Sequence, residues 1–238
     1  GLLRRQRQMC IRDRLNSFGT YNISVTAGSN CDTPASDNIV ITLSQEPTIT
    51  NTVTAQELCS FDTSVQFDLT SDVDGTTYSW IAIENENLTG YEESGTTAFI
   101  PSQIITNSTN SDQDLVYAII PIANGCAGTP FEYTLTVQPI PVVADKDETI
   151  CNGETFTIQP TDNFPTEIIP IGTTYSWPAP VSYPTGVITG GTSASAQSLI
   201  SQTLSNTSDY PATLTYSVTP NFNGCDGETF DIDITVNP

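Results

Sequence analysis

Residues 214–238 decide the fold, and they read Leu214-Thr-Tyr-Ser-Val-Thr-Pro-Asn-Phe-Asn-Gly-Cys-Asp-Gly-Glu-Thr-Phe-Asp-Ile-Asp-Ile-Thr-Val-Asn-Pro238. From Phe230 to Val236 every second residue is apolar, and the residues between them are Asp or Thr. A period of two is typical of a β-strand with one buried face and one wet face. The residues from Leu214 to Val218 alternate in the same way, and Asn-Gly-Cys-x-Gly supplies a turn between the two runs. The stretch therefore predicts an antiparallel hairpin.

This hairpin pattern occurs twice. Residues 115–139 match residues 214–238 at eleven of 25 positions without a gap, including the Asn-Gly-Cys-x-Gly turn. Shorter motifs recur upstream, namely Tyr78-Ser-Trp80 with Tyr175-Ser-Trp177, and Glu57-Leu-Cys59 with Thr149-Ile-Cys151. Internal repeats of this kind define the units of the chain. They predict the C-terminal strands of a truncated unit at 15–47 and two full units at 48–139 and 140–238.

Both full units are predicted to be β throughout. No stretch shows the 3.6-residue apolar period of a helix, and Thr, Pro, Asn and Gly are spread too evenly for long helices. Units of 92 and 99 residues with about seven short strands have the size of an immunoglobulin-like domain. The predicted fold class is all-β, with tandem immunoglobulin-like antiparallel β-sandwiches.

Composition excludes several functions. The chain of 238 residues has no histidine, so histidine-based catalysis and histidine-ligated metal sites are excluded. Its net charge of −21 argues against nucleic acid and anionic membranes as partners. Its longest apolar runs, such as 117–123, are far shorter than the ~18 residues of a membrane span, so no membrane insertion is expected.

The first 14 residues differ sharply from the rest. They carry five of the six basic residues, which are Arg4, Arg5, Arg7, Arg12 and Arg14. The stretch from Met9 to Arg14 back-translates to DNA that resembles a sequencing-library adapter. We interpret 1–14, with Cys10, as translated adapter on a metagenomic fragment and expect it to be disordered. A signal peptide fits less well, because no apolar segment of 7–15 residues follows.

Several of these motifs resemble one family. Thr149-Ile-Cys-Asn-Gly-Glu154, Tyr175-Ser-Trp177, the run Leu-Ser-Asn-Thr at 204–207 and the Asn-Gly-Cys-x-Gly turn are similar to PKD-like repeats. Such repeats, with related Ig-like modules, occur in tandem in large cell-surface and secreted proteins of Bacteroidota, many of them adhesin-like or gliding-associated. The resemblance implies an extracellular, oxidising setting and a spacer or adhesive role. It supplies no catalytic motif.

Catalysis is not expected. A Ser or Cys nucleophile would need Lys146 or a carboxylate as its base, and no nucleophile-elbow pattern is present. The paired carboxylates Glu84 with Glu86, and Glu92 with Glu93, could serve a glycosidase. They lie in stretches rich in Asn, Gly and Thr, which indicates solvated loop charges. The sequence therefore predicts a protein that is not an enzyme.

One segment could bind calcium. Asp72-Val-Asp74-Gly75 has the oxygen spacing of a calcium loop, but the downstream bidentate Glu of an EF-hand is missing. An Asp-Gly turn before a strand explains the same residues, and the second full unit lacks the motif. We expect no cofactor, with Asp72 and Asp74 left open as a weak calcium site.

The aromatic residues that recur in the two full units allow two interpretations. Trp80 and Trp177, with Tyr117 and Tyr216, fit the core positions of an Ig-like sandwich. Exposed aromatic rings on a β-sandwich could instead stack on sugars. The predicted function is a structural spacer or stalk in a cell-surface or secreted adhesin-like protein, and the alternative is a carbohydrate-binding adhesin module. The expected partners are neighbouring repeats, surface glycans or other cell-surface proteins.

Cysteine pairing also leaves alternatives. Apart from Cys10, the cysteines are Cys31, Cys59, Cys126, Cys151 and Cys225. Pairing within repeats would join Cys59 to Cys126 and Cys151 to Cys225. In a seven-strand sandwich, however, the first and last inter-strand turns lie at opposite ends, roughly 20 Å apart, which exceeds the ~7 Å limit between the Cα atoms of a disulfide.

A head-to-tail array brings together the top of one module and the bottom of the next. We therefore favour a disulfide across the junction, Cys59 to Cys225, which leaves Cys31, Cys126 and Cys151 for partners beyond the chain. Residues 15–47 hold only a hairpin, which is marginally stable alone. We expect this segment to be poorly ordered or to dock on the first full module.

Overall fold

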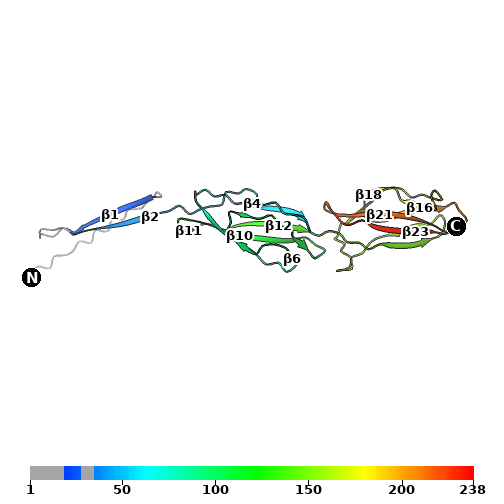
Figure 1. The fold of residues 1–238 in the computed structure, drawn as a ribbon, viewed down its shortest axis with the longest axis horizontal. Coiled ribbons are helices and arrows are strands. Elements are labelled where there is room, and N and C mark those ends of the chain that lie inside the picture. The colour runs from blue at the N-terminus through cyan, green and yellow to red at the C-terminus, as the bar shows by residue number, and fades with distance from the viewer. Residues whose placement is uncertain (1–18, 28–34) are drawn as a thin grey trace, which may run out of the picture.

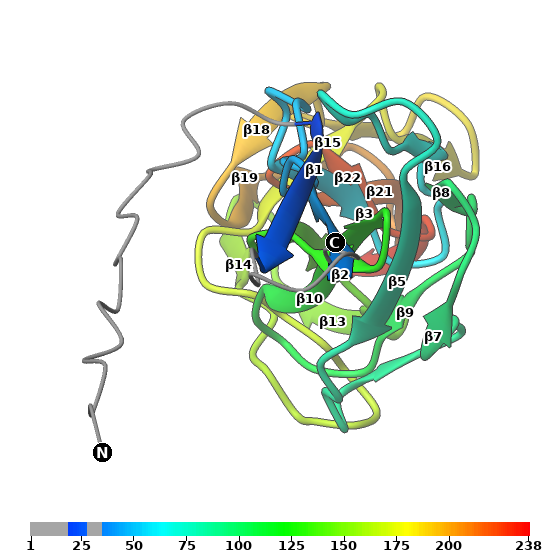
Figure 2. The ribbon, with the colours of Figure 1, turned by 90° about the vertical axis from the view of Figure 1, so that its left-hand side faces the viewer.

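The computed structural model describes residues 19–27 and 35–238, and every regular element in these ranges is a β-strand. The strands form a hairpin followed by two sandwiches, arranged in a row (Figure 1). Viewed along that row, the two sandwiches lie one behind the other (Figure 2). The predicted adapter segment 1–14, with Cys10, and the turn cysteine Cys31 lie outside the described residues.

The first two strands form a hairpin in the segment predicted to be a truncated unit. Strands β1 (Gly19–Ala27) and β2 (Ala35–Leu43) pair antiparallel from Gly19 opposite Leu43 to Ala27 opposite Ala35. They join no other sheet in the described part of the chain. The strands therefore add to no sheet of the first full module, whereas the linker after them is hydrogen-bonded to that module.

The first module is built on one large sheet. Its strands are β3 (Ala55–Cys59), β4 (Phe67–Asp68), β5 (Thr77–Ala82), β6 (Leu88–Thr89), β7 (Ser94–Gly95), β8 (Phe99–Ile100), β9 (Thr106–Asn107), β10 (Gln113–Ala123), β11 (Cys126–Ala127) and β12 (Phe131–Gln138). The sheet order is β3-β12-β10-β5-β7, with β11 beside β10. The short pairs β4-β8 and β6-β9 form separate two-stranded sheets.

The second module repeats this plan. Its strands are β13 (Lys146–Ile150), β14 (Thr155–Ile158), β15 (Thr174–Trp177), β16 (Val181–Tyr183), β17 (Ile188–Thr189), β18 (Ala194–Gln197), β19 (Ile200–Thr203), β20 (Ser205–Asn206), β21 (Ala212–Phe222), β22 (Cys225–Asp226) and β23 (Phe230–Val236). The sheet order is β13-β23-β21-β15-β18, with β16 and β22 beside β21. The pairs β14-β19 and β17-β20 complete the module.

The predicted tandem antiparallel sandwiches are confirmed, with one parallel pair of strands in each module. The first strand of each module pairs in parallel with the last strand, β3 with β12 and β13 with β23. Two strands that run in the same direction start at one end of the sheet and finish at the other. The chain therefore enters each module at one end and leaves it at the opposite end.

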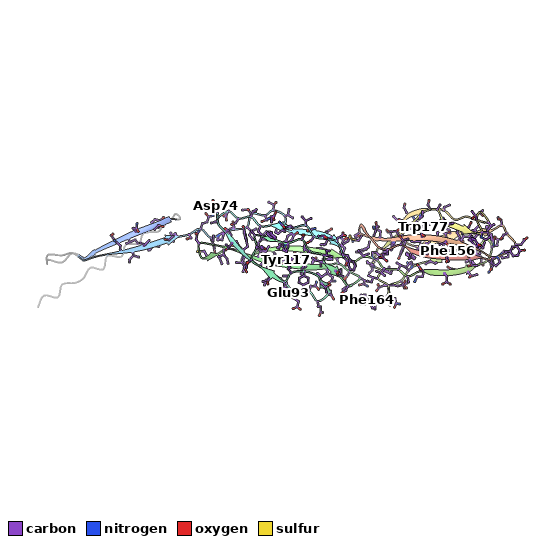
Figure 3. The ribbon with its side chains drawn as sticks, in the orientation of Figure 1. Asp74, Glu93, Tyr117, Phe156, Phe164 and Trp177 are labelled. Atoms are coloured by element: carbon purple, nitrogen blue, oxygen red, sulfur yellow. A yellow bond between two sulfur atoms is a disulfide. The ribbon has the colours of Figure 1, made fainter. Side chains whose placement is uncertain are left out.

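Each module has its own hydrophobic core. In the first, Trp80 and Tyr117 are 1% and 0% exposed, and their rings meet edge to face at 5.7 Å. In the second, the rings of Trp177 and Tyr216 meet edge to face at 6.3 Å. Figure 3 shows Tyr117, Phe156 and Trp177 within the modules. Burial raises the pKa of Tyr117 to about 12, because a phenolate would lose its hydration in this core. The two buried clusters share no residue, so each module is a separate packing unit.

No helix long and apolar enough to cross a membrane occurs in the described part of the chain.

Candidate functional site at the module junction

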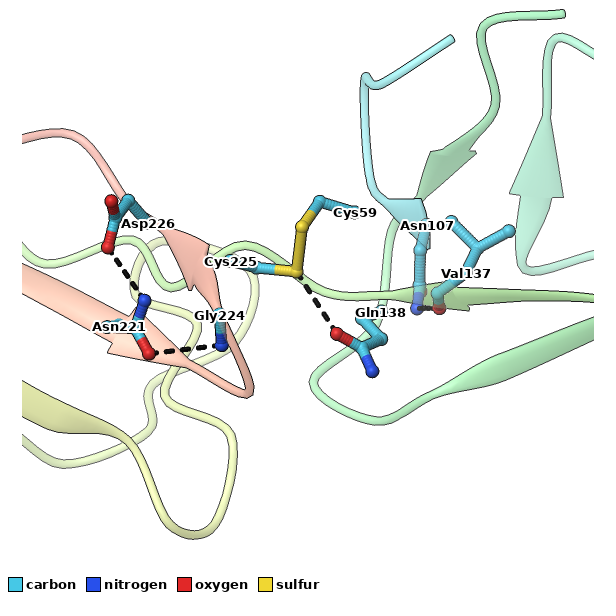
Figure 4. The surroundings of a disulfide bond; sticks show 8 residues. All are labelled: Cys59, Asn107, Val137, Gln138, Asn221, Gly224, Cys225 and Asp226. Carbon is cyan, nitrogen blue, oxygen red and sulfur yellow. Dashed lines mark hydrogen bonds between the residues drawn. A yellow bond between two sulfur atoms is a disulfide. The ribbon is translucent and has the colours of Figure 1, made fainter. Parts of the chain in front are cut away.

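The two modules are joined covalently where they meet. The sulfur atoms of Cys59 and Cys225 form a disulfide, with the Cα atoms 5.6 Å apart and a sequence separation of 166 (Figure 4). Cys59 is the last residue of β3, and Cys225 is the first residue of β22. The bond therefore connects the outgoing end of the first module to the incoming end of the second.

Strand register explains why these cysteines meet. Cys59 lies opposite Gln138 at the final position of the parallel β3-β12 ladder, so it marks the exit of the first module. Cys225 follows a tight turn in which Asn223 and Gly224 have φ values of 50° and 93°. The side-chain oxygen of Gln138 lies 3.2 Å from the sulfur of Cys225 (Figure 4).

The within-repeat pairs do not occur. Cys126 and Cys151 are free and exposed in the structure. Cys126 begins β11 at the entrance of the first module, and Cys151 follows β13 at the exit of the second. Each lies at the end of its module opposite to the cysteine that the alternative would pair with it.

The last glycine of the turn motif has a separate role. A Cβ atom on Gly227 would lie 2.1 Å from the carbonyl oxygen of Pro141, so only glycine lets the linker pass this closely. A Cβ atom on Gly128 would lie 1.7 Å from the carbonyl oxygen of Pro47. Both linkers therefore lie against the turn of the module that they enter.

The linker between the modules is fixed to the second module. The backbones of Val142 and Ile168 exchange two hydrogen bonds of 2.9 Å. The carboxylate of Glu167 accepts a hydrogen bond from the N–H of Ala144 at 3.1 Å, and it forms an ion pair with Lys146 at 2.6 Å. The hydrogen bond from Lys146 lowers the pKa of the Glu167 carboxyl, with further help from the Ala144 N–H. The linker is thus held along its length rather than only stiffened by its prolines.

The linker that enters the first module is held in a similar way. Asp72 accepts the N–H of Thr48 at 2.7 Å and the side-chain amide of Gln45 at 3.0 Å. The hydrogen bond from Thr48 lowers the pKa of Asp72. Both oxygens of this predicted calcium ligand thus hold the linker, while Asp74 is exposed in a turn beside Gly75, which has a φ of 74°. Among the described residues, no group of three or more Cys, Asp or Glu side chains is placed to hold a metal ion.

A cleft runs along the junction. It has a volume of about 1060 Å³, and Phe61, Val142 and Phe164 are among the residues that line it. Phe61 is 62% exposed and has a φ of 70°, which is a costly backbone conformation for a bulky residue. The side-chain amide of Asn110 donates a hydrogen bond across the junction to Asp162 at 2.9 Å.

Two asparagines at the module exits were not predicted. The side-chain amide of Asn107 donates to the carbonyl of Val137 at 2.8 Å, and that of Asn206 to the carbonyl of Val236 at 2.9 Å. Both asparagines are about 95% buried, so each ties the last strand of its module to a two-residue strand, β9 or β20. The two asparagines are 99 residues apart, as are the matched positions of the repeat, and this spacing could have identified them as equivalent.

The aromatic and acidic candidates fall into two groups. Trp80 and Trp177 are in the cores and have no face free for a sugar. The carboxylate pairs at 84, 86, 92 and 93 are all exposed, with Glu93 at the edge of the first module in Figure 3. Within 19–27 and 35–238, the exposed aromatic residues are instead Phe61, Phe164, Tyr183 and Tyr210.

Comparison with known proteins agrees with this architecture. Residues 56–141 and 148–238 each match the model of the PKD-like domain. The chain is similar to an I-band fragment of titin, at 10% identity over 92% of this chain and 74% of that one, with a TM-score of 0.42. It is also similar to the extracellular cadherin domains of protocadherin gamma B2, at 12% identity over 92% of this chain and 45% of that one, with a TM-score of 0.32. No curated protein matches. With two tandem matches that span more than half of its length, the chain belongs to the PKD-like domain family.

Proposed function

We propose that the chain is a non-catalytic spacer or stalk segment of a bacterial cell-surface or secreted adhesin-like protein, of the Bacteroidota type that its motifs resemble. The observation that carries this proposal is the junction, where the Cys59–Cys225 disulfide and the fixed linker hold two modules together. A flexible tether would need neither contact. A spacer that projects a distal domain needs both.

Two further properties support a spacer. The chain enters and leaves each module at opposite ends, so added modules lengthen the row instead of folding back on it. The net charge of −21 makes neighbouring modules repel each other, which favours an extended and soluble array. The disulfide suits an oxidising compartment outside the cytoplasm.

Small-angle X-ray scattering of the full chain tests the proposal. We expect a rod-like profile whose longest dimension is the same at low and high protein concentration. Cys59→Ser should broaden the distribution of dimensions, because it removes the bond between modules. Cys126→Ser is the matched control, since this cysteine is free and exposed, and it should change nothing. A compact profile for the unaltered chain would overturn the spacer proposal.

The proposed spacer works without a cofactor. Both carboxylate oxygens of Asp72 already accept hydrogen bonds from the linker, so calcium would have to share these oxygens with the linker. We expect millimolar calcium to leave the melting temperature unchanged. A rise that is lost in Asp74→Asn, but not in the exposed control Glu93→Gln, would establish a calcium site instead.

A second candidate function rests on exposed rings. Tyr183 and Tyr210 are 81% and 76% exposed, and both lie near the exit of the second module. Exposed tyrosine rings can stack on sugars, so a carbohydrate-binding adhesin module is the alternative. Binding on a glycan array that is lost in Tyr183→Ala or Tyr210→Ala, and kept in Phe164→Ala, would favour it.

A further inference from the structure

The free cysteine at the exit of the second module corresponds to a bonded one. In the first module, Cys59 ends the β3-β12 ladder opposite Gln138. In the second module, the last pair of the β13-β23 ladder is Ile150 opposite Val236, and Cys151 is the next residue. Val236 corresponds to the residue before Gln138 in the repeat. Cys151 therefore occupies the place in the second module that Cys59 occupies in the first.

The surroundings of these two cysteines also correspond. The backbone N–H of Asn107 donates to the hydroxyl of Ser60, directly after Cys59, at 2.9 Å. The backbone N–H of Asn206 donates to the side-chain oxygen of Asn152, directly after Cys151, at 3.0 Å. The exit of the second module therefore has the local structure that supports the disulfide at the exit of the first.

The free cysteine at the entrance of the first module has the same relation to Cys225. Asn124 and Gly125, just before Cys126, have φ values of 51° and 77°, close to the 50° and 93° at the two residues before Cys225. The close approach of Gly128 to the preceding linker also matches that of Gly227. Cys126 itself lines a pocket beside that linker.

Exposure distinguishes the bonded turn cysteine from the free one. Cys225 is 1% exposed, since it is bonded to the neighbouring module, whereas Cys126 is exposed. Cys151 is exposed as well. The second module therefore offers a free exit cysteine, and the first module a free entrance cysteine. Each is the half of a junction whose complete form is present between the two modules.

We propose that Cys151 and Cys126 are the two complementary halves of further inter-module disulfides. Cys151 bonds the turn cysteine of a PKD-like module that follows, and Cys126 bonds the first-strand cysteine of a module that precedes. The pairing is always exit to entrance, so it gives a head-to-tail array of one polarity. This inference rests on the proposed spacer function and names the partner that the spacer takes at each end.

The bond forms by thiol–disulfide exchange with a small-molecule or protein disulfide as the oxidant. The thiolate of Cys151 attacks the oxidant to give a mixed disulfide and releases one thiol. The thiolate of the incoming turn cysteine then attacks the Cys151 sulfur and releases the second thiol. Two cysteine thiols are oxidised, one disulfide of the oxidant is reduced to two thiols, and the protons pass to those products.

A lengthened chain tests the Cys151 half. A second copy of residues 140–238 is placed directly after Pro238, where it repeats the natural junction that follows Pro139. After refolding in oxidised and reduced glutathione, peptide mapping without reduction should find Cys151 bonded to the Cys225 counterpart of the added copy. Replacing that added cysteine by Ser is the matched control, and it should leave Cys151 open to alkylation.

A second chain tests the Cys126 half independently. Residues 48–141 are duplicated in place, so that each copy is entered through its own linker. The Cys59 of the first copy should then bond the Cys126 of the second copy. This variant also keeps the test decisive if the C-terminal extension does not fold. An intact Cys59–Cys225 bond in each chain shows that the original junction has folded.

Several outcomes would overturn the proposal. One is complete alkylation of Cys151 in a folded, lengthened chain. Another is Cys151 bonded mainly to the Cys151 of a second molecule. A third is a new bond that reduces at a more than tenfold lower concentration of reduced glutathione than Cys59–Cys225. X-ray scattering from the same chains distinguishes failure of this inference from failure of the proposed spacer function. A rod-like profile without the new disulfide would overturn the inference and still support the spacer function.

Discussion

Phe61 carries backbone strain at the junction. Its φ of 70° matches the φ of 83° at Gly153, the glycine at the same place in the second module. A side chain in this conformation costs about 1 kcal/mol or more relative to glycine. We expect Phe61→Gly to raise the free energy of unfolding of the first module by about 1 kcal/mol, measured by urea denaturation.

The matched control is Phe61→Ala, which keeps the strain and removes the ring. Because the Phe61 ring is 62% exposed, its loss should cost little. Phe61→Gly should therefore be more stable than Phe61→Ala. The reverse order would show that the ring, and not the backbone, sets the stability at this position.

The sequence predicts the burial of some single residues and not of others. Burial of Trp80 and Trp177 follows from the alternation around them, because that pattern assigns each ring to the inner face of a strand. Burial of Asn107 and Asn206 does not follow from composition, since asparagine is usually exposed. Their partners are carbonyls 30 positions away in sequence, and no local pattern encodes such a contact.

At the scale of elements, long strands were predictable and short ones were not. The alternation at 230–236 corresponds to β23, and the run expected from Leu214 to Val218 lies within β21. Strands such as β6 and β9 have two residues each, too few to show a period. The parallel pairing of β3 with β12 was missed because it joins the two ends of a module, where turn chemistry gives no information.

The linkers should respond to acid. The folded-state pKa of Glu167 and that of Asp72 both lie below their ordinary values. Each group therefore stabilises the folded state fully above its unfolded-state pKa, and this stabilisation is lost as the pH falls through the lower folded-state pKa. We expect the linkers to loosen as the pH falls below about 4.5, the ordinary range of these carboxyl groups.

Glu167→Gln isolates one of these two contributions. Between pH 6 and pH 3.5 the variant should lose less stability than the unaltered chain, because it has no carboxylate to protonate. Glu93→Gln, on an exposed residue of the other module, serves as the control and should behave like the unaltered chain. Melting temperatures across this pH range make the comparison, and identical slopes in all three chains would contradict the role of Glu167.

For the whole molecule, the junction disulfide should stabilise both modules. When one module unfolds and the other stays folded, the bond and the linker hold both ends of the unfolded segment against the folded neighbour. A closed loop of this size, near 80 residues, is worth about 4 kcal/mol in the chain-entropy model. We expect Cys59→Ser to lower the denaturation midpoints of both modules, with Cys126→Ser unchanged. A shift in one module alone would contradict this coupling.

The same bond has a consequence under tension. A pulling force applied to the two ends of the chain passes through the sulfur atoms and bypasses the residues between Cys59 and Cys225. The segment between them, with a sequence separation of 166, would otherwise extend by roughly 560 Å at ~3.4 Å per residue. Stretched in a single-molecule instrument, the oxidised protein should therefore lengthen little, and the reduced protein should release this hidden length. A stalk built this way resists being drawn out even when the cores of its modules give way.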